Sequence, residues 1–325
     1  MLSRTLAILA TLLFSFPAAA DYGVALNAQT HIRFASADEG RRVLGSADNF
    51  TRALSAFDRS VRRQTEQAVS ATDFLEFASQ QVLPWSDAEV ENLREILAPV
   101  GTLFFDRTLR FPPVVLLVKT SGYEEGHTPY HRGNAIVLPA GVLQWPRETL
   151  HEIIVHELFH VMTSANPELR EALYGVIGFG SCAPLQLPPG LASRKITNPD
   201  APGLGHCMSL GDGSSGDVVF PVLLSSAERY DPARSGGLLE YVALDLVVAE
   251  WRDGGWKPKQ VDGALTRLGH GQFQSFLDRI GKNTANSAHP EEILADNFVL
   301  LVKGVRDVPT PSIIAAIDKV LGWSR

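Results

Sequence analysis

The sequence predicts an α+β fold, in which a small mixed sheet with an antiparallel edge strand packs on one long helix and the rest is mostly helical. Two short β-type runs, 113–119 and 134–138, precede an amphipathic helix that starts at Pro146. Apolar residues recur at helical spacing through residues 47–100. The 325 residues, 45% hydrophobic and 20% charged, have an ordinary globular composition.

The first twenty residues are typical of a signal peptide. Arg4 is followed by an apolar run over residues 6–16 and by three alanines at 18–20, which form an A-x-A cleavage site. The apolar run is shorter than the roughly 20 residues that a membrane span requires. We therefore expect residues 1–20 to be removed and the protein to be periplasmic or secreted.

The remaining chain, residues 21–325, is expected to form one domain with a helical N-terminal part at 21–110. No later apolar run reaches the length of a membrane span. The formal net charge is −7 and no basic cluster is present in the sequence. An acidic chain of this kind is a poor partner for nucleic acids or anionic membranes, so neither is expected.

The two cysteines, Cys182 and Cys207, both lie in the exported part. Export exposes the chain to oxidising conditions, so we expect them to form a disulfide. They fall within residues 178–216, a stretch rich in Gly, Pro and Ser that is typical of a long loop.

Further helices are expected along the second half of the chain. Pro290 suits a first helical position, and Glu291 and Glu292 would lie in a first turn, where carboxylates favour the helix dipole. The expected helices cover residues 168–177, 237–251, 273–280 and 290–302.

The helix that starts at Pro146 contains His156-Glu157-Leu158-Phe159-His160, an H-E-x-x-H motif. Four residues are just over one helical turn, so both imidazoles project from one face and can bind one Zn²⁺. Glu157 is turned aside from that face and can reach a metal-bound water. The motif predicts one zinc per chain, with His156 and His160 as ligands.

A catalytic zinc needs a third protein ligand and leaves its fourth position to water. Asn166 stands where a third histidine six residues after His160 would be, so that ligand pattern is excluded. The best candidate is Glu292, and Glu291 and Glu240 are competing candidates that spacing does not separate from it.

Glu292 and Asp296 resemble the E-x-x-x-D element of gluzincin zinc peptidases such as thermolysin. The resemblance implies a zincin-like domain in which Glu292 is the third zinc ligand and Asp296 orients a ligating histidine. It also implies hydrolysis of peptide bonds, with Glu157 as the general base.

Asn134-Ala135 resembles the Asn-Ala pair on the edge strand of thermolysin-like enzymes, which implies that these residues bind the substrate backbone. No His or Tyr follows Asp296, so the electrophilic histidine of that family has no counterpart there. The stretches 198–200 and 289–298 also resemble uncharacterised bacterial zincin-like proteins, and imply no substrate.

An oxyanion would need a donor beside zinc. We favour Tyr230 because it lies in the sequence between the expected ligands. Four more residues are candidates for this role: Tyr241, His206, Tyr130 and His131.

Two functions are consistent with these residues. The first is an exported zinc peptidase that cleaves peptide or protein substrates. The alternative is a zincin-fold binding protein that holds zinc without turnover, and a metal-free structural protein is a third possibility. The intact Glu157 favours the peptidase.

Overall fold

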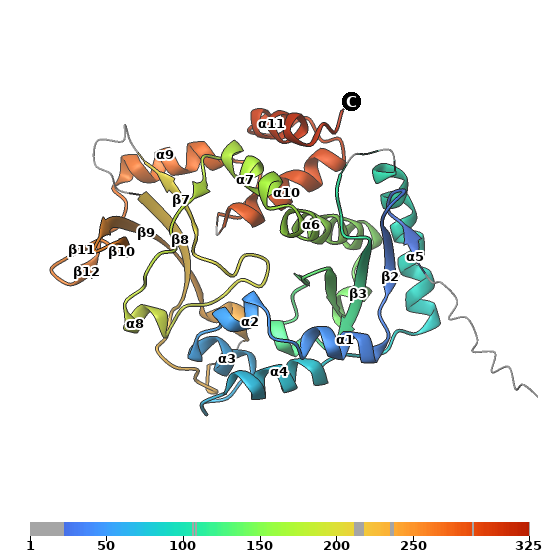
Figure 1. Ribbon diagram of the computed structural model, residues 1–325, viewed down its shortest axis with the longest axis horizontal. Helices are drawn as coiled ribbons and strands as arrows, with labels where there is room; N and C mark the ends of the chain where they lie inside the picture. Colours follow the sequence, from blue (N-terminus) through green and yellow to red (C-terminus); the bar gives the residue numbers. More distant parts are fainter. Residues whose placement is uncertain are drawn as a thin grey trace, which may run out of the picture.

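The computed structural model describes residues 23–105, 107, 109–210, 218–234, 237–287 and 289–324, so the expected signal peptide lies outside it. The described residues form an α+β fold with two five-stranded sheets on opposite sides of a central helix, α6 (Figure 1). The predicted α+β class is confirmed. None of the helices in these ranges combines the length and hydrophobicity that crossing a membrane requires.

The first sheet is mixed, with the strand order β1-β2-β3-β5-β4. β2, β3 and β5 run parallel, and β1 and β4 are antiparallel edge strands. The predicted antiparallel edge is therefore present, but it is β4 and not the Asn134–Leu138 run, which lies inside the sheet as β5. The strands are β1 (Val24–Ala25), β2 (His31–Phe34), β3 (Val114–Thr120), β4 (Tyr130–Arg132) and β5 (Ala135–Pro139).

Five helices precede β3 within the described ranges, and side chains cap each of them at its N-terminus. In each case the side chain of the cap residue accepts a hydrogen bond from the N–H of the third helical residue, and the side chain of that third residue accepts one from the N–H of the cap residue. These bonds satisfy N–H groups that have no partner within the helix. The N-terminal part is helical as expected, but it also supplies β1 and β2 to the first sheet. The helices are α1 (Ala37–Leu44), α2 (Asn49–Ala53), α3 (Ala56–Arg62), α4 (Ala71–Gln80) and α5 (Asp87–Phe104).

Helix α6 (Arg147–Ala165) lies at the centre because apolar residues surround it on several sides. Leu150, Ile154, Leu158 and Phe159 are all fully buried. α6 contacts β4 and β5 of the sheet and also α5, α7 and α10. Proline begins each of the three later helices that pack near it, which suits a first helical position: α7 (Pro167–Val176), α10 (Pro290–Val302) and α11 (Pro311–Leu321).

The second sheet is antiparallel, in the order β10-β9-β8-β7-β6, and the sequence patterns did not predict it. It overturns the expectation that the rest of the chain is mostly helical, and the loop expected at 178–216 includes β6, α8 and β7. The elements are β6 (Gly180–Ser181), α8 (Pro189–Ala192), β7 (His206–Ser209), β8 (Val218–Ser225), β9 (Val242–Arg252) and β10 (Gly255–Pro258).

The helix predicted at 237–251 is wrong. These residues form a 3-10 turn, η3 (Leu238–Tyr241), and then strand β9, which pairs with β8 from Val218↔Ala249 to Ser225↔Val242. A short apolar run fits a strand or a buried helix equally well by periodicity. The partner strand, distant in sequence, decides between them by satisfying the backbone groups of β9.

The remaining elements are short connections and one helix. α9 covers the second sheet on the side of the main apolar core, where its Phe276 joins Met208 of β7 and Val219 of β8. The elements are η1 (Tyr123–Glu125), η2 (Ala140–Gln144), β11 (Gln260–Val261), β12 (Ala264–Leu265) and α9 (His270–Ile280).

The predicted disulfide is confirmed: Cys182 and Cys207 are bonded, with their Cα atoms 5.9 Å apart. Cys207 lies in β7 and pairs with Gly180 of β6. The bond therefore joins β7 to the chain just after the edge strand β6, at the start of the segment that leads to α8.

Removing the disulfide should destabilise the protein. The cysteines are 25 residues apart, and closing a loop of that length contributes about 3–4 kcal/mol to the free energy of unfolding in the chain-entropy model. We expect the Cys182→Ala/Cys207→Ala variant to lose about this amount in urea unfolding. Wild-type protein unfolded with a reducing agent is the control and should behave like the variant. An unchanged midpoint would contradict the expectation.

Candidate metal centre

Helices α6 and α10 bring the three expected ligands together. His156 and His160 lie on the side of α6 that faces α10, with their ring centroids 4.7 Å apart. Oε2 of Glu292, in the first turn of α10, is 3.2 Å from Nε2 of His156 and 3.7 Å from Nε2 of His160. One potential ligand atom from each residue lies within 4.8 Å of the others, which is close enough for a single ion to gather them.

Carboxylates on α10 orient both imidazoles. Nδ1 of His156 is 3.1 Å from Oδ1 of Asp296, and Nδ1 of His160 is 3.0 Å from Oε1 of Glu291. An imidazole that donates through Nδ1 keeps the lone pair of Nε2 for a metal. Both Nε2 atoms are thereby directed toward Glu292. The contact between Asp296 and a candidate ligand histidine is the one expected from the sequence.

Glu291 has a different position from its neighbour Glu292. It is almost fully buried and accepts hydrogen bonds from His160, from the Thr163 hydroxyl and from the Tyr174 hydroxyl. Burial alone would raise its pKa, but these bonds, with His160 foremost, hold the pKa below its usual value. Glu291 was a candidate third ligand, and the geometry makes it the residue that holds His160.

Glu292 is held from its other side by the long segment between α8 and β7. Its Oε1 accepts a hydrogen bond of 2.6 Å from Nδ2 of Asn198. Burial alone would raise the pKa of Glu292, but the charge of His160 and the hydrogen bond with His156 lower it strongly. The carboxylate is therefore ionised and has one oxygen, Oε2, directed at the two imidazoles.

Two polar atoms at this centre are sealed from solvent without a hydrogen-bond partner among the described residues, namely Nε2 of His160 and Oε2 of Glu157. Buried polar atoms nearly always have a partner, and a bound cation or a water molecule would supply one to these two atoms. Two imidazole nitrogens and one carboxylate oxygen are a donor set that suits Zn²⁺. The residues present therefore fit a zinc ion.

Glu157 is buried beside these atoms. Burial raises its pKa to about 8, and the negative charge of Asp200 acts in the same direction. A cation bound next to Glu157 would favour its ionised form. In this environment the ionised form of Glu157 is unfavourable unless a positive charge lies nearby.

Asp200 completes a second group of possible ligands, with Glu157 and His160. Because Nδ1 of His160 is bonded to Glu291, only its Nε2 remains for a metal, and both groups must use that atom. The two groups therefore describe one metal position and not two. Asp200 lies on the side of that position where Glu157 is found.

Asp200 also holds His131 of the edge strand β4. Its Oδ1 accepts hydrogen bonds from the backbone N–H of His131, at 2.8 Å, and from Nδ1 of its ring, at 2.6 Å. The His131 ring stacks on that of His160, with centroids 5.7 Å apart and an interplanar angle of 28°. Of the five candidate oxyanion donors, His131 is the one that contacts the candidate ligands.

A cleft of about 520 Å³ lies beside the candidate ligands and could admit a substrate. His156, Glu157 and Asp296 form its polar wall. The other lining residues are both apolar and polar, and most come from the first half of α6, from α10 and from the segment before α10: Pro129, Trp145, Thr149, Glu152, Ile153, Asn283, Thr284, Val299 and Leu300.

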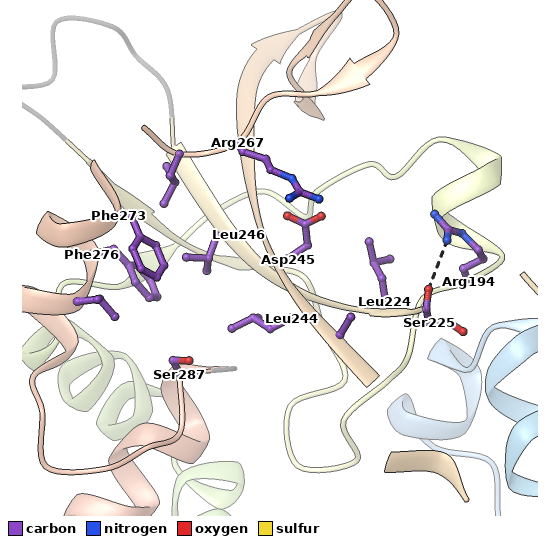
Figure 2. A pocket seen from close by; sticks show the side chains of 13 residues that line it. Arg194, Leu224, Ser225, Leu244, Asp245, Leu246, Arg267, Phe273, Phe276 and Ser287 are labelled. Carbon is purple, nitrogen blue, oxygen red and sulfur yellow. Dashed lines mark hydrogen bonds between the residues drawn. The ribbon is translucent and has the colours of Figure 1, made fainter. Parts of the chain in front are cut away.

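A second hollow, of about 570 Å³, lies over β8, β9 and α9 (Figure 2). Figure 2 shows Phe273 and Phe276 at one end and Arg194 at the other, with Arg267 and Asp245 pointing toward one another between them. No histidine, cysteine or glutamate is among its described lining residues. It offers no ligand set comparable with that of the α6–α10 cleft.

Tyr230 does not meet the expectation that it faces the metal. It is buried in an apolar cluster that also contains Tyr241, a second candidate donor. His206 is engaged with Glu171, at 2.8 Å, and the Tyr130 hydroxyl donates to a carboxylate of η1. None of these four side chains is therefore placed to donate beside the metal.

Asn134 and Ala135 are not at a free edge, and that expectation is wrong. Nδ2 of Asn134 donates to the carbonyl of Val114, and Ala135 is fully buried between β3 and β4. Strand β4 lies between β5 and the edge of the sheet. Because β4 has only three residues, its sequence did not predict a strand there. Glu240, a candidate third ligand, is exposed in η3, away from the two histidines.

Asn198 and Asp200 contact the candidate metal centre, although the sequence patterns assigned them no role. An Asn-Pro-Asp tripeptide in a Gly- and Pro-rich stretch gives no periodic pattern from which a role follows. Only the fold brings this tripeptide against α10 and β4.

Comparison with known proteins gives no relative for this chain. No protein-family model, curated protein or solved structure matches it.

The geometry predicts different losses of zinc affinity for the α10 carboxylates. Glu292→Gln should abolish stoichiometric binding, as His156→Ala and His160→Ala should, because a ligand is lost. Asp296→Ala and Glu291→Gln should weaken binding by roughly 10–100-fold, since these residues orient ligands. Competition with a chromophoric chelator measures the zinc dissociation constant of each variant. A larger loss for Glu291→Gln than for Glu292→Gln would reverse the assignment.

Proposed function

We propose that this protein is an exported, zinc-dependent peptidase of zincin-like fold, with zinc held by His156, His160 and Glu292. The observation that carries the proposal is the convergence of these side chains around the sealed, unpartnered Nε2 of His160, with Glu157 alongside. The disulfide is consistent with a periplasmic or secreted location.

Zinc in such a site polarises a carbonyl group and lowers the pKa of bound water to near 7. Glu157 lies next to the candidate ligands without being needed as one, and its Oε2 has no other partner among the described residues. It would take the proton of the attacking water and deliver it to the leaving nitrogen. Peptide hydrolysis needs both of these proton transfers.

His131 is the donor that we assign to the developing oxyanion, in place of Tyr230. Asp200 occupies its Nδ1, and the ring is held against His160. Nε2 is then the ring nitrogen left to donate. His131 lines a smaller hollow with Asp200 and not the cleft beside Glu157, so this role requires a substrate that extends beyond the cleft. A donor fixed in position before the reaction stabilises charge that develops in the transition state.

The cleft beside Glu157 supports an extended polypeptide as the substrate. Its wall carries the apolar residues Trp145, Ile153 and Leu300. Three acidic residues, Glu152, Glu157 and Asp296, also line it. Peptides with apolar side chains would bury apolar surface there. We therefore propose substrates with largely apolar sequences.

A specific observation favours the second candidate, a zinc-binding protein without turnover. Asp200 is within reach of the same metal position and also binds the backbone N–H of His131 on the edge strand. If Asp200 took the fourth position, the coordination sphere would be closed, which is typical of structural zinc sites. A peptide-library screen of zinc-loaded protein distinguishes the two candidates, because only the peptidase gives cleavage products.

Glu157→Gln should keep zinc and fold but lose activity. Glutamine has nearly the same size and shape and cannot accept the water proton. We expect hydrolysis of a library-derived peptide to fall by at least roughly 10²–10⁴-fold, with zinc occupancy measured by metal analysis unchanged. Glu148→Gln, which alters an exposed glutamate of the same helix outside the cleft, is the matched control. Full activity in Glu157→Gln would contradict the mechanism.

His131→Phe should retain the ring stacked on His160 and remove the donor. We expect kcat to fall by roughly 10²-fold, the loss typical of one oxyanion donor, while KM and zinc occupancy change little. Steady-state kinetics with the same peptide measure both constants. Tyr230→Phe should be close to wild type. If Tyr230→Phe instead shows the larger loss in kcat, the oxyanion role belongs to Tyr230.

A further inference from the structure

Residues 195–200, here the strap, connect the N-terminal helices to the candidate metal centre. The strap follows α8 and is fixed at its start by backbone contacts. The Ser55 hydroxyl donates to the carbonyl of Lys195 at 2.7 Å, and the N–H of Ile196 donates to the carbonyl of Leu223 at 2.8 Å. The strap is thus attached both to α3 and to β8 before it reaches the metal centre.

Thr197 is the main anchor of the strap on α3. Its N–H and its hydroxyl donate to the two carboxylate oxygens of Asp58, at 3.0 and 2.7 Å. Its carbonyl accepts a hydrogen bond of 2.9 Å from Nη2 of Arg62. The N–H, the hydroxyl and the carbonyl of Thr197 are therefore all bonded to α3, and the residue is 2% exposed.

Asp58 and Arg62 are part of a buried ion-pair network that includes Glu125 of η1. Arg62 contacts Oδ1 of Asp58 at 2.7 Å and both carboxylate oxygens of Glu125, at 2.8 and 2.5 Å. All three residues are at most 4% exposed. Removing one partner from such a network leaves a buried charge uncompensated, so each of the three residues depends on the others.

The residues that follow Thr197 contact the metal centre directly. Asn198 donates to Oε1 of Glu292, and its own Oδ1 accepts the N–H of Asp200 at 2.9 Å. Asp200 holds His131 and lies beside Glu157. A displacement at Thr197 would therefore move partners of Glu292 and of His131 together.

We propose that Asp58, Arg62 and Thr197 are positioning residues for the proposed metal centre, so that helix α3, which is distant in sequence from all candidate ligands, helps to set the geometry of that centre. The proposal rests on the proposed metal site. The buried network fixes the position of the strap at Thr197. The strap in turn positions Asn198 and Asp200, which hold the Glu292 carboxylate and the His131 ring by hydrogen bonds.

Thr197→Val tests this coupling because it is isosteric and removes only the hydroxyl bonds. Substituting Arg62 or Asp58 would leave an unpaired buried charge and could unfold the protein. The Thr197 hydroxyl contacts Oδ2 of Asp58, the carbonyl of Ala53 and Nζ of Lys195, and the substitution removes all three contacts. We expect the zinc dissociation constant of Thr197→Val to rise roughly 2- to 10-fold, which corresponds to the net free energy of about one hydrogen bond. Asn198→Ala, one step closer, should lose roughly 10–100-fold. Thr197→Ser should restore binding close to that of the wild type.

Thr30→Val is the matched control, since Thr30 is equally buried, at 1% exposure, in the turn between β1 and β2. Zinc affinity comes from chelator competition, and the visible absorption of Co²⁺-loaded protein reports the ligand geometry. We expect the Co²⁺ bands to change in Thr197→Val and to remain as in the wild type in Thr197→Ser and Thr30→Val.

Wild-type zinc affinity and Co²⁺ bands in Thr197→Val would overturn the coupling alone and leave the metal site standing. Equal losses in Thr30→Val would overturn it too, because the effect would be general loosening of the fold. Failure of the wild-type protein to bind zinc at all would overturn the proposed function and this inference together.

Discussion

Helix α10 packs along α6, and this contact puts two neighbouring glutamates against two histidines one turn apart. Adjacent residues on a helix point about 100° apart, so Glu291 and Glu292 cannot share a role. One takes the Nδ1 side of His160, and the other faces both Nε2 atoms. Burying carboxylates and imidazoles is unfavourable unless they have hydrogen-bond or ionic partners. The packing of α10 on α6 therefore depends on the contacts between these polar groups.

The rest of the fold supplies partners to that centre from three directions. α7 contributes the Tyr174 hydroxyl to Glu291, the edge strand β4 contributes His131, and the strap contributes Asn198 and Asp200. The second sheet matters here indirectly, because β8 holds the start of the strap. Nε2 of His160 and Oε2 of Glu157 have no hydrogen-bond partner among the described residues, and under the proposed function the zinc ion would lie beside both atoms.

Several elements followed from local patterns alone. The helix with the H-E-x-x-H motif, the helix from Pro290 to Val302 and the two strands of the first sheet have sharp periodicity or clear caps, and they lie where the sequence placed them. The 237–251 segment failed for a physical reason. Its apolar run suits either a strand or a helix, and pairing with β8, which no local pattern encodes, stabilises the strand.

The sequence by itself determined that His156 and His160 share a helix face with Glu157 turned aside, because residue spacing within a helix is a local property. It also predicted that the two cysteines form a disulfide, because the expected signal peptide implies export to an oxidising compartment. The tertiary structure decided that Glu292 and not Glu240 or Glu291 faces both imidazoles, that β4 and not β5 is the edge, and that His131 and not Tyr230 lies beside the centre. These outcomes depend on helix register and strand order, which are set by contacts between residues far apart in the chain.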